Sequence, residues 1–356
     1  MNKKYYIIPI FIPHRGCPHD CVFCNQRKIT GLDTEITEEE VVEIIEKNLN
    51  TMQKDSIKEV AFFGGSFTGL DISTQKSLLS IAKRYKDNGK IHKIRLSTRP
   101  DYIDCEIIEN LKGCSVDIIE LGVQSMDNDV LIKSNRGHDI SDVYHAVDLI
   151  KKNDFELGLQ MMVGLVGDTK FKSLFTAKEF IKLSPNLVRI YPTLVVKETY
   201  LEELYKSGEY EPLTINKTID YVKDILMLFE YYDIPVIRIG LQPTDNISLN
   251  KDVIVGPFHP AIRQIIESKI YSDVLEMFID ENKFKSKELI VSLNNKYVSN
   301  FVGFKGENLK KLKQNFRVKI LGTNSGDEII INDGTDKYKL NRKYFTERYL
   351  AEHNLI

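Results

Sequence analysis

Three cysteines near the amino end of this 356-residue chain have a spacing that suits metal chemistry. Cys17, Cys21 and Cys24 form a C-x-x-x-C-x-x-C pattern. The pattern directly follows an apolar run, Tyr5–Pro13, that we expect to be a strand. Cysteine thiolates are the ligands that iron–sulfur clusters require. Three of them on one loop can hold three irons of a [4Fe–4S] cube, and the fourth iron then stays open to a substrate or a cofactor.

Two other roles for these cysteines remain open. A zinc site would need a fourth ligand, which His14 or His19 would have to supply, whereas structural zinc usually takes paired C-x-x-C spacings. A disulfide scaffold is disfavoured because the chain has five cysteines and no apolar signal segment at its start. Cys105 and Cys114 lie in a region predicted to be helix followed by strand, and we expect both to be buried small hydrophobic residues.

The composition is typical of a globular protein. Hydrophobic residues make up 42% of the chain and charged residues 28%, and no apolar run is long enough to cross a bilayer. We therefore expect a soluble cytoplasmic protein without membrane contact. The formal net charge of −2 predicts no general attraction to nucleic acid, so any such binding requires a local basic patch.

Short β-rich runs alternate with longer amphipathic runs as far as about residue 240. The predicted strands are Val60–Gly64, Ile94–Thr98, Asp117–Gly122, Glu156–Val163, Leu187–Tyr191 and Val236–Ile239. The predicted helices are Thr37–Asn48, Ser73–Arg84, Ser141–Asn153, Leu174–Leu183 and Ile215–Tyr232. Strict alternation implies right-handed βαβ units and a parallel sheet. We therefore predict an α/β fold, a full or partial (β/α) TIM-like barrel with its site at the carboxyl ends of the strands.

The unusual residues do cluster just after the predicted strands. The second strand runs into Phe62–Phe67, the third into Ser97–Asp101 and the fourth into Glu120–Ser125. Adjacent glycines such as Gly64 and Gly65 often mark only a tight turn. Directly after a strand, in a chain with the cysteine loop, they also let the backbone come close to a ligand.

These segments resemble the radical S-adenosylmethionine (radical SAM) enzymes, and within them the catalytic subunit of the Elongator complex and its archaeal and bacterial relatives. The resemblance covers roughly residues 5–258. Besides the cysteine loop, it rests on Gly64–Ser66, Thr98–Asp101, Glu120–Ser125, Asn135–His138, Ile190–Val195 and Thr199–Tyr210. It implies that the free iron chelates SAM. Reductive cleavage of SAM would then give methionine and a 5′-deoxyadenosyl radical that takes hydrogen from a substrate.

The resemblance also implies roles for single residues. The implied cofactor-binding set is Phe23, Gly64, Gly65, Ser66, Ser97, Thr98, Gln124 and Arg136. Phe23 would pack beside the cluster, and the glycine-rich segment would bind the amino group of the SAM methionine, with Ser66 in place of the commoner Glu. Gln124 and Arg136 would contact the ribose and the carboxylate. Ser97 departs from the family, because relatives often have an acidic residue at this position.

One charged residue lies inside a predicted strand. Arg189 must be paired or face the barrel lumen there, so it would contact substrate, SAM or a structural carboxylate. Tyr191 and Lys197 come at and after the end of the same strand and are further candidates for substrate contacts.

The tail carries a separate pattern. Its predicted elements are the strand Leu289–Leu293, the helix Tyr297–Val302, the helix Glu307–Phe316 and the strands Val318–Leu321 and Glu328–Ile331. A G-x-x-G loop made of Gly303, Phe304, Lys305 and Gly306 separates the two helices. This order resembles a KH domain, whose G-x-x-G loop clamps the backbone of single-stranded nucleic acid. The alternative is a glycine turn between two helices, with its lysines in solvent.

We therefore expect three segments: a radical SAM barrel over residues 1–258, a connecting helical segment over 259–285 and a KH-like domain over 286–356. No pattern of the acetyltransferase domain found in Elongator subunits is recognisable, so their reaction cannot be transferred whole. The expected function is a radical SAM enzyme that acts on RNA, by family analogy tRNA, and takes electrons from a donor such as flavodoxin or ferredoxin. The alternatives are a small-molecule enzyme like oxygen-independent coproporphyrinogen oxidase, and an RNA-binding protein with a structural or redox-sensing cluster.

Overall fold

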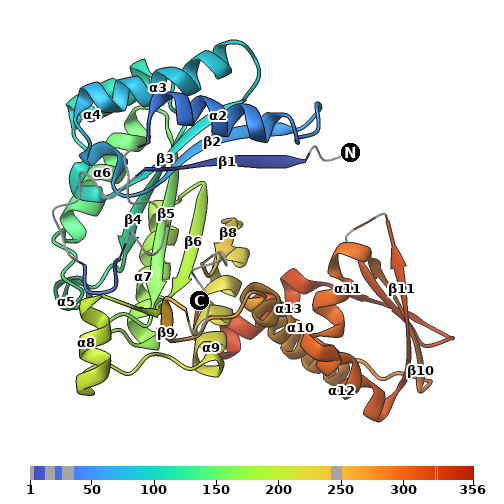
Figure 1. Ribbon diagram of the computed structural model, residues 1–356. Helices are drawn as coiled ribbons and strands as arrows, with labels where there is room; N and C mark the ends of the chain where they lie inside the picture. The colour runs from blue at the N-terminus through green and yellow to red at the C-terminus, as the bar shows by residue number, and fades with distance from the viewer. Residues whose placement is uncertain (1–3, 13–20, 26–35, 242–250, 325, 327) are drawn as a thin grey trace. The chain divides into compact units, whose positions relative to one another are not determined.

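The chain divides into two compact units in the computed structural model (Figure 1). One unit comprises residues 1–214 and 241–258, and the other comprises 215–240 and 259–356. The structure describes residues 4–12, 21–25, 36–241, 251–324, 326 and 328–356. The three domain bounds predicted from the sequence stay a prediction.

The first unit is built on a parallel sheet in which six strands follow one another in chain order. They are β1 (Tyr5–Ile12), β2 (Ile57–Gly64), β3 (Lys93–Thr98), β4 (Ile118–Gln124), β5 (Glu156–Val163) and β6 (Leu187–Pro192). The connecting helices are α2 (Glu38–Leu49), α3 (Ile72–Asp87), α4 (Cys105–Gly113), α5 (Asn128–Lys133), α6 (Ile140–Lys152) and α7 (Lys170–Leu183). The sheet curls into a partial barrel, which confirms the predicted (β/α) fold.

Side-chain alternation decides the two faces of this sheet. Ile8, Ile10 and Ile12 of β1 are buried, whereas Phe11 between them is exposed. On the opposite face of the sheet, the other strands carry charged side chains, among them Glu120. One face therefore forms an apolar core, and the other can present polar groups.

The start of one helix and the burial of two cysteines differ from the sequence prediction. Helix α7 begins at Lys170, four residues before the predicted start, because the hydroxyl of Thr169 accepts a hydrogen bond from the amide of Lys172 and caps the helix. The predicted burial of both cysteines was wrong, because Cys105 is exposed at the first position of α4 and Cys114 is half-buried at its C-cap.

The end of the first unit adds a small antiparallel pair that the sequence pattern did not predict. Strands β7 (Val195–Val196) and β9 (Val253–Val255) pair, and helix α8 (Tyr200–Ser207) follows β7. These two short strands are far apart in the sequence, so local periodicity could not predict their pairing.

The second unit contains a four-stranded mixed sheet of order β11-β10-β12-β13. Its strands are β10 (Glu288–Asn294), β11 (Arg317–Thr323), β12 (Ile329–Asn332) and β13 (Lys337–Leu340), and a further strand, β8 (Val236–Ile239), belongs to the same unit. Its helices are α9 (Ile215–Tyr231), α10 (Ile262–Glu281), α11 (Asn295–Val302), α12 (Glu307–Asn315) and α13 (Arg342–Glu352). The predicted elements of the tail are confirmed, whereas β13 and α13 were not predicted. Within the described ranges, no helix is both long and apolar enough to cross a membrane.

Candidate active site

Three backbone hydrogen bonds fix the described part of the cysteine loop. The amide of Val22 donates to the carbonyl of Ser134 at 3.1 Å, and the carbonyl of Val22 accepts from the amide of Leu201 at 2.7 Å. The amide of Cys24 donates to the carbonyl of Cys21 at 2.9 Å and closes a turn between them. The loop is thus tied to the end of α5 and to the start of α8. Cys17 lies outside the described residues, as do His14 and His19.

An apolar cluster packs against the same loop. Val22 is buried together with Val195, Leu201 and Tyr210, and Phe23 packs against this group. The hydroxyl of Tyr210 donates to the carbonyl of Gly164 at 2.6 Å, so this buried polar group has a partner. These contacts give the segment Thr199–Tyr210 a physical role that its sequence alone did not reveal: it supports the cysteine loop.

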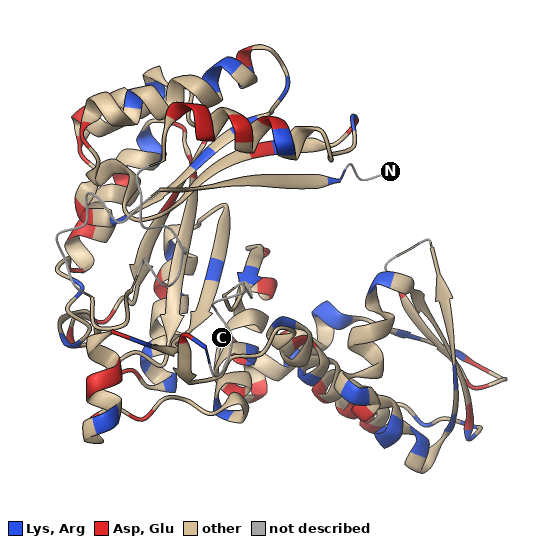
Figure 2. Ribbon diagram, in the orientation of Figure 1, with Lys and Arg blue, Asp and Glu red and all other residues tan. Residues whose placement is uncertain are grey.

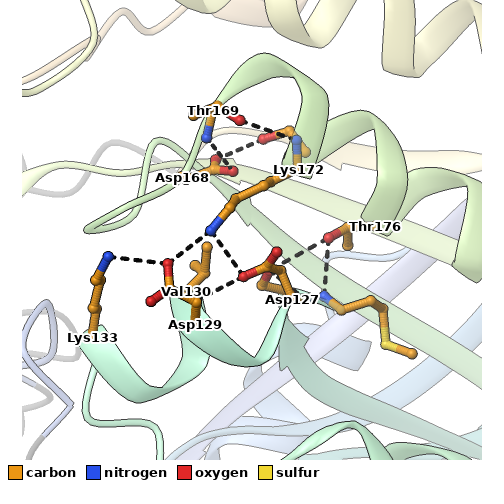
Figure 3. Close-up of polar contacts among 11 residues, drawn as sticks. Asp127, Asp129, Val130, Lys133, Asp168, Thr169, Lys172 and Thr176 are labelled. Atoms are coloured by element: carbon orange, nitrogen blue, oxygen red, sulfur yellow. Dashed lines mark hydrogen bonds and ion pairs between the residues drawn. The ribbon is translucent and has the colours of Figure 1, made fainter.

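A polar network holds α5 against α7 (Figure 3). The C-cap of α5 is Ser134, whose carbonyl binds the cysteine loop. The ammonium of Lys172 lies 3.0 Å from a carboxylate oxygen of Asp127 and 2.8 Å from one of Asp129. The hydroxyl of Thr176 accepts the amide of Met126 at 2.9 Å. Because these groups come from the segments after β4 and β5, the network stabilises the carboxyl-end edge of the sheet where the cysteines lie.

Two arginines surround the sulfur of Cys21. Arg136 Nη1 lies 3.3 Å from Cys21 Sγ and Arg99 Nη1 lies 4.0 Å from it. Cys21 is buried, and so are both arginines. Two guanidinium groups beside one sulfur suit a metal-bound thiolate, which carries negative charge. In the part of the chain that the structure describes, no three His, Cys, Asp or Glu side chains are grouped to hold a metal ion, and Cys17 is not in that part.

The predicted SAM contacts Gln124 and Arg136 converge on one glycine. A Cβ atom on Gly122 would lie only 3.1 Å from both Gln124 Nε2 and Arg136 Nη2, so a side chain there would have to displace the ends of both. Gln124 has a φ of 73° and lies at a register shift between β4 and β5. Residues other than glycine with such a left-handed backbone conformation are often found at functional sites. Arg136 Nε is buried and has no hydrogen-bond partner among the described residues. A buried donor of this kind suits a carboxylate such as that of SAM.

The glycine-rich segment and the end of β3 are joined by hydroxyl groups. The hydroxyl of Thr98 lies 2.7 Å from that of Ser66 and 2.5 Å from that of Thr68. The hydroxyl of Ser97 donates to the carbonyl of Phe62 at 3.5 Å. In this arrangement the predicted cofactor-binding hydroxyls connect two loops, and their contact with SAM stays a prediction.

The two glycines of this segment differ in their surroundings. Gly64 has a φ of +111°, and a Cβ there would lie 2.5 Å from the carbonyl oxygen of Ile12, so the close approach of β1 requires this glycine. Gly65 follows in a half-buried bend. Gly64 therefore has a structural reason to be glycine, and the contact of Gly65 with a ligand stays a prediction.

The predicted substrate residues have different surroundings. Arg189 is buried, and its Nε lies 2.6 Å from Glu120 Oε2, which is the structural-carboxylate alternative considered above. Tyr191 is half-buried on the same face. Lys197 has an exposed side chain, and its carbonyl accepts from Asn25 Nδ2 at 3.2 Å. Lys197 thus contacts the end of the cysteine loop through its backbone.

Sequence reasoning assigned no role to three further residues at this edge: Arg99, Asp101 and His138. Arg99 and Asp101 form a bidentate ion pair with distances of 2.9 and 2.8 Å. Burial disfavours the charged form of the Asp101 carboxylate. The hydrogen bonds and charge of Arg99 outweigh this effect, so the pKa of Asp101 is lowered. Burial, and then the charge of Arg136, hold the pKa of the His138 imidazole far below its usual value. The sequence signal was the Thr98–Asp101 motif, in which an arginine and an aspartate flank a proline just after a strand.

Comparison with known proteins defines the class. Residues 11–174 match the Radical SAM superfamily, and residues 185–272 match the Radical_SAM C-terminal domain. An uncharacterized protein of Methanocaldococcus jannaschii is 32% identical over 239 residues, which cover 63% of this chain and 72% of that protein. The chain belongs to the radical SAM superfamily. It is an enzyme of that superfamily, whose cofactors are the [4Fe–4S] cluster and SAM expected from the cysteine loop.

The relatives also include Elongator-type and heme-related proteins. A tRNA uridine(34) acetyltransferase of Methanocaldococcus infernus is 29% identical over 194 residues, covering 47% of this chain and only 36% of that protein. The heme chaperone HemW of Lactococcus lactis is 24% identical over 370 residues, covering 92% of this chain and 95% of that protein. The solved structure of the archaeal Methanocaldococcus infernus Elp3 has the same fold, with a TM-score of 0.59 at 19% identity over 76% of this chain and 63% of that chain.

Substitution of Gly65 tests the glycine-rich segment. We expect Gly65→Val to lower SAM cleavage by about 100-fold or more, because misplacing reacting groups by about 1 Å has a cost of this size. The rate is measured as 5′-deoxyadenosine formed by the dithionite-reduced protein, with iron content determined in parallel. The matched control is Gly113→Val, because a Cβ at Gly113 meets no atom within 4 Å. Equal product from the Gly65 variant and the parent would show that no ligand approaches this backbone.

Proposed function

We propose that this radical SAM enzyme acts on RNA, with tRNA as the substrate, and that the second unit contacts the RNA backbone. The cofactors supply the reductive cleavage of SAM and a radical that takes hydrogen from the substrate. The protein's own residues hold the cluster, position SAM and exclude water. The observation that carries the proposal is the geometry of the G-x-x-G loop, and the tRNA-modifying relative supports it.

The two glycines of this loop have different environments. A Cβ on Gly303 would lie 2.7 Å from Asn308 Cγ and 2.8 Å from Asn308 N, so this glycine lets the loop fold back on α12. Gly306 has a φ of +75°, and a Cβ there would meet no atom within 4 Å. Lys305 between them is exposed, with a φ of 53°. One glycine thus shapes the loop, and the other leaves a backbone that a sugar-phosphate chain can approach.

The elements around the loop support a KH-like arrangement. The parallel strands β10 and β11 are connected by α11, the loop and α12. Leu289, Val291 and Leu293 of β10 are buried, so the sheet has one packed face. The loop opens directly into the first turn of α12, whose free amides favour anions. This is the placement that a clamp for a nucleic acid backbone requires.

The charges of α12 also favour RNA (Figure 2). Lys310 and Lys313 are exposed on this helix, and Lys311 pairs with Glu276 of α10. The whole chain has a net charge of −2, so a basic loop and helix form a local exception. Attraction to phosphate should therefore depend on this patch and weaken with salt.

Replacing Phe304 and Lys305 together by Asp tests the proposal. We expect tRNA affinity to fall and its salt dependence to become shallower, by a slope of about 0.7 for each lost contact to a single strand. Electrophoretic mobility shifts over a salt series measure both. Cluster content and SAM cleavage without substrate should not change, because the substituted residues belong to the second unit.

The matched control replaces Lys343 and Tyr344 on α13 by Asp. These residues are an exposed lysine and an exposed aromatic residue of the same unit, whereas Phe304 is half-buried, and the change in charge is identical. The control should bind tRNA like the parent. If the Phe304 and Lys305 variant does so too, the KH-like assignment is wrong. A small-molecule radical SAM enzyme then becomes the better proposal.

A further inference from the structure

We propose that Arg99 is a positioning residue that fixes Arg136 beside Cys21 and raises the reduction potential of the cluster that Cys21 ligates. The inference concerns the cofactors of the superfamily and does not depend on the RNA proposal. It extends to a residue that neither the cysteine spacing nor the predicted SAM contacts include.

Arg99 is placed by contacts from three separate segments. Its amide donates to the hydroxyl of Ser66 at 3.2 Å, and its side chain forms the bidentate pair with Asp101. Its Nη2 donates to the carbonyl of Arg136 at 2.6 Å. The side chain is only 3% exposed. A guanidinium held at these points cannot adopt other rotamers without breaking buried hydrogen bonds.

The remaining guanidinium nitrogen of Arg99 is directed at Cys21, 4.0 Å from its sulfur. Arg99 also binds the backbone carbonyl of Arg136. The side chain of Arg136 lies 3.3 Å from the same sulfur and donates to the carbonyl of Gly122. Arg99 therefore acts on Cys21 twice. It adds its own positive charge, and it fixes the segment that carries the closer donor.

Hydrogen bonds to ligand sulfurs and nearby positive charge set the potentials of iron–sulfur clusters. Reduction adds one electron, here taken from dithionite, and makes the cluster more negative. A buried cation near a ligand sulfur stabilises that reduced form more than the oxidised form. Removing Arg99 should therefore make the cluster harder to reduce.

The test is a redox titration of the full-length protein with its cluster and without SAM, followed by electron paramagnetic resonance. In Arg99→Gln the midpoint potential should shift to more negative values. The expected effect is about a tenfold lower ratio of reduced to oxidised cluster at a fixed potential, which is 59 mV for a one-electron couple. Arg99→Lys retains the charge but not the planar fork, so it should recover part of the shift.

Lys133→Gln is the matched control, because it removes one positive charge from an exposed side chain of α5. Its potential should equal that of the parent. An unchanged potential in Arg99→Gln with full iron content would overturn the inference. Loss of the cluster from both folded Arg99 variants would also contradict it, because contacts that only tune a potential are not needed for iron to bind.

Discussion

Cys21→Ala and Cys24→Ala should each lose the [4Fe–4S] cluster and all SAM cleavage. The cluster requires one thiolate for each of three irons, and the only cysteines with suitable spacing are Cys17, Cys21 and Cys24. Cys21 has the strongest structural support, because its sulfur lies within 4.0 Å of guanidinium nitrogens of both Arg99 and Arg136. We expect Cys17→Ala to have the same effect, although this residue lies outside the described ranges.

Iron and sulfide analysis with electron paramagnetic resonance of the anaerobically reconstituted variants measures cluster content. Cys105→Ala and Cys114→Ala are the matched controls. They lie at the two ends of α4 and should retain the cluster in full. Full cluster content in Cys21→Ala would refute the assignment of the ligands. If the parent protein has normal cluster content but forms no 5′-deoxyadenosine, a structural or redox-sensing role of the cluster is favoured instead.

The parallel sheet could be predicted because its strands and most of the helices between them have a strong local pattern. Alternation of strands and helices is itself the signature of a parallel sheet, and β2 to β6 lie within a few residues of their predicted bounds. The rule that sites gather at carboxyl ends then brought the cysteine loop, the glycine-rich segment and Gln124 to one edge. This part of the site was predictable because backbone topology alone determines it.

The contacts within the site were less predictable because they depend on side chains from distant segments. Thr199–Tyr210 was recognised only as a family pattern, yet its Leu201 fixes the cysteine loop through the carbonyl of Val22. The same limit applies to Arg99, whose contact with Cys21 joins residues 78 positions apart. Neither contact has a periodicity that a single sequence could display.

Arg189 shows a related limit. The sequence indicated that a charge inside a strand must be paired, but not with which residue. Its partner, Glu120, lies on β4, two strands away in the sheet. The carboxylate can reach across β5 because the intervening residue is Gly158, where a Cβ would lie 2.6 Å from Glu120 Cγ. A glycine in the middle of a strand was the only local signal of this close approach.

This buried pair belongs to a larger network of charges. Glu120 accepts hydrogen bonds from Arg189 at 2.6 and 3.1 Å and also pairs with Arg95. Arg95 pairs in turn with Glu59, whose other oxygen accepts the hydroxyl of Tyr5. Glu120, Arg95 and Glu59 are at most 3% exposed. Removing Glu120 would leave two buried guanidiniums with one carboxylate, and an uncompensated buried charge costs about 3–5 kcal/mol.

Glu120→Ala should therefore lower the free energy of unfolding by about 3–5 kcal/mol. Urea unfolding followed by circular dichroism and tyrosine fluorescence measures this, since the chain has no tryptophan. Glu156→Ala on β5 is the matched control: Glu156 pairs with Lys93, and both side chains are about one third exposed. The free energy of unfolding of this variant should fall by only about 0–1 kcal/mol, because water can take the place of the lost contact at an exposed charge. If the two variants lose equal stability, the network does not stabilise the barrel, and Arg189 is again a candidate for substrate binding.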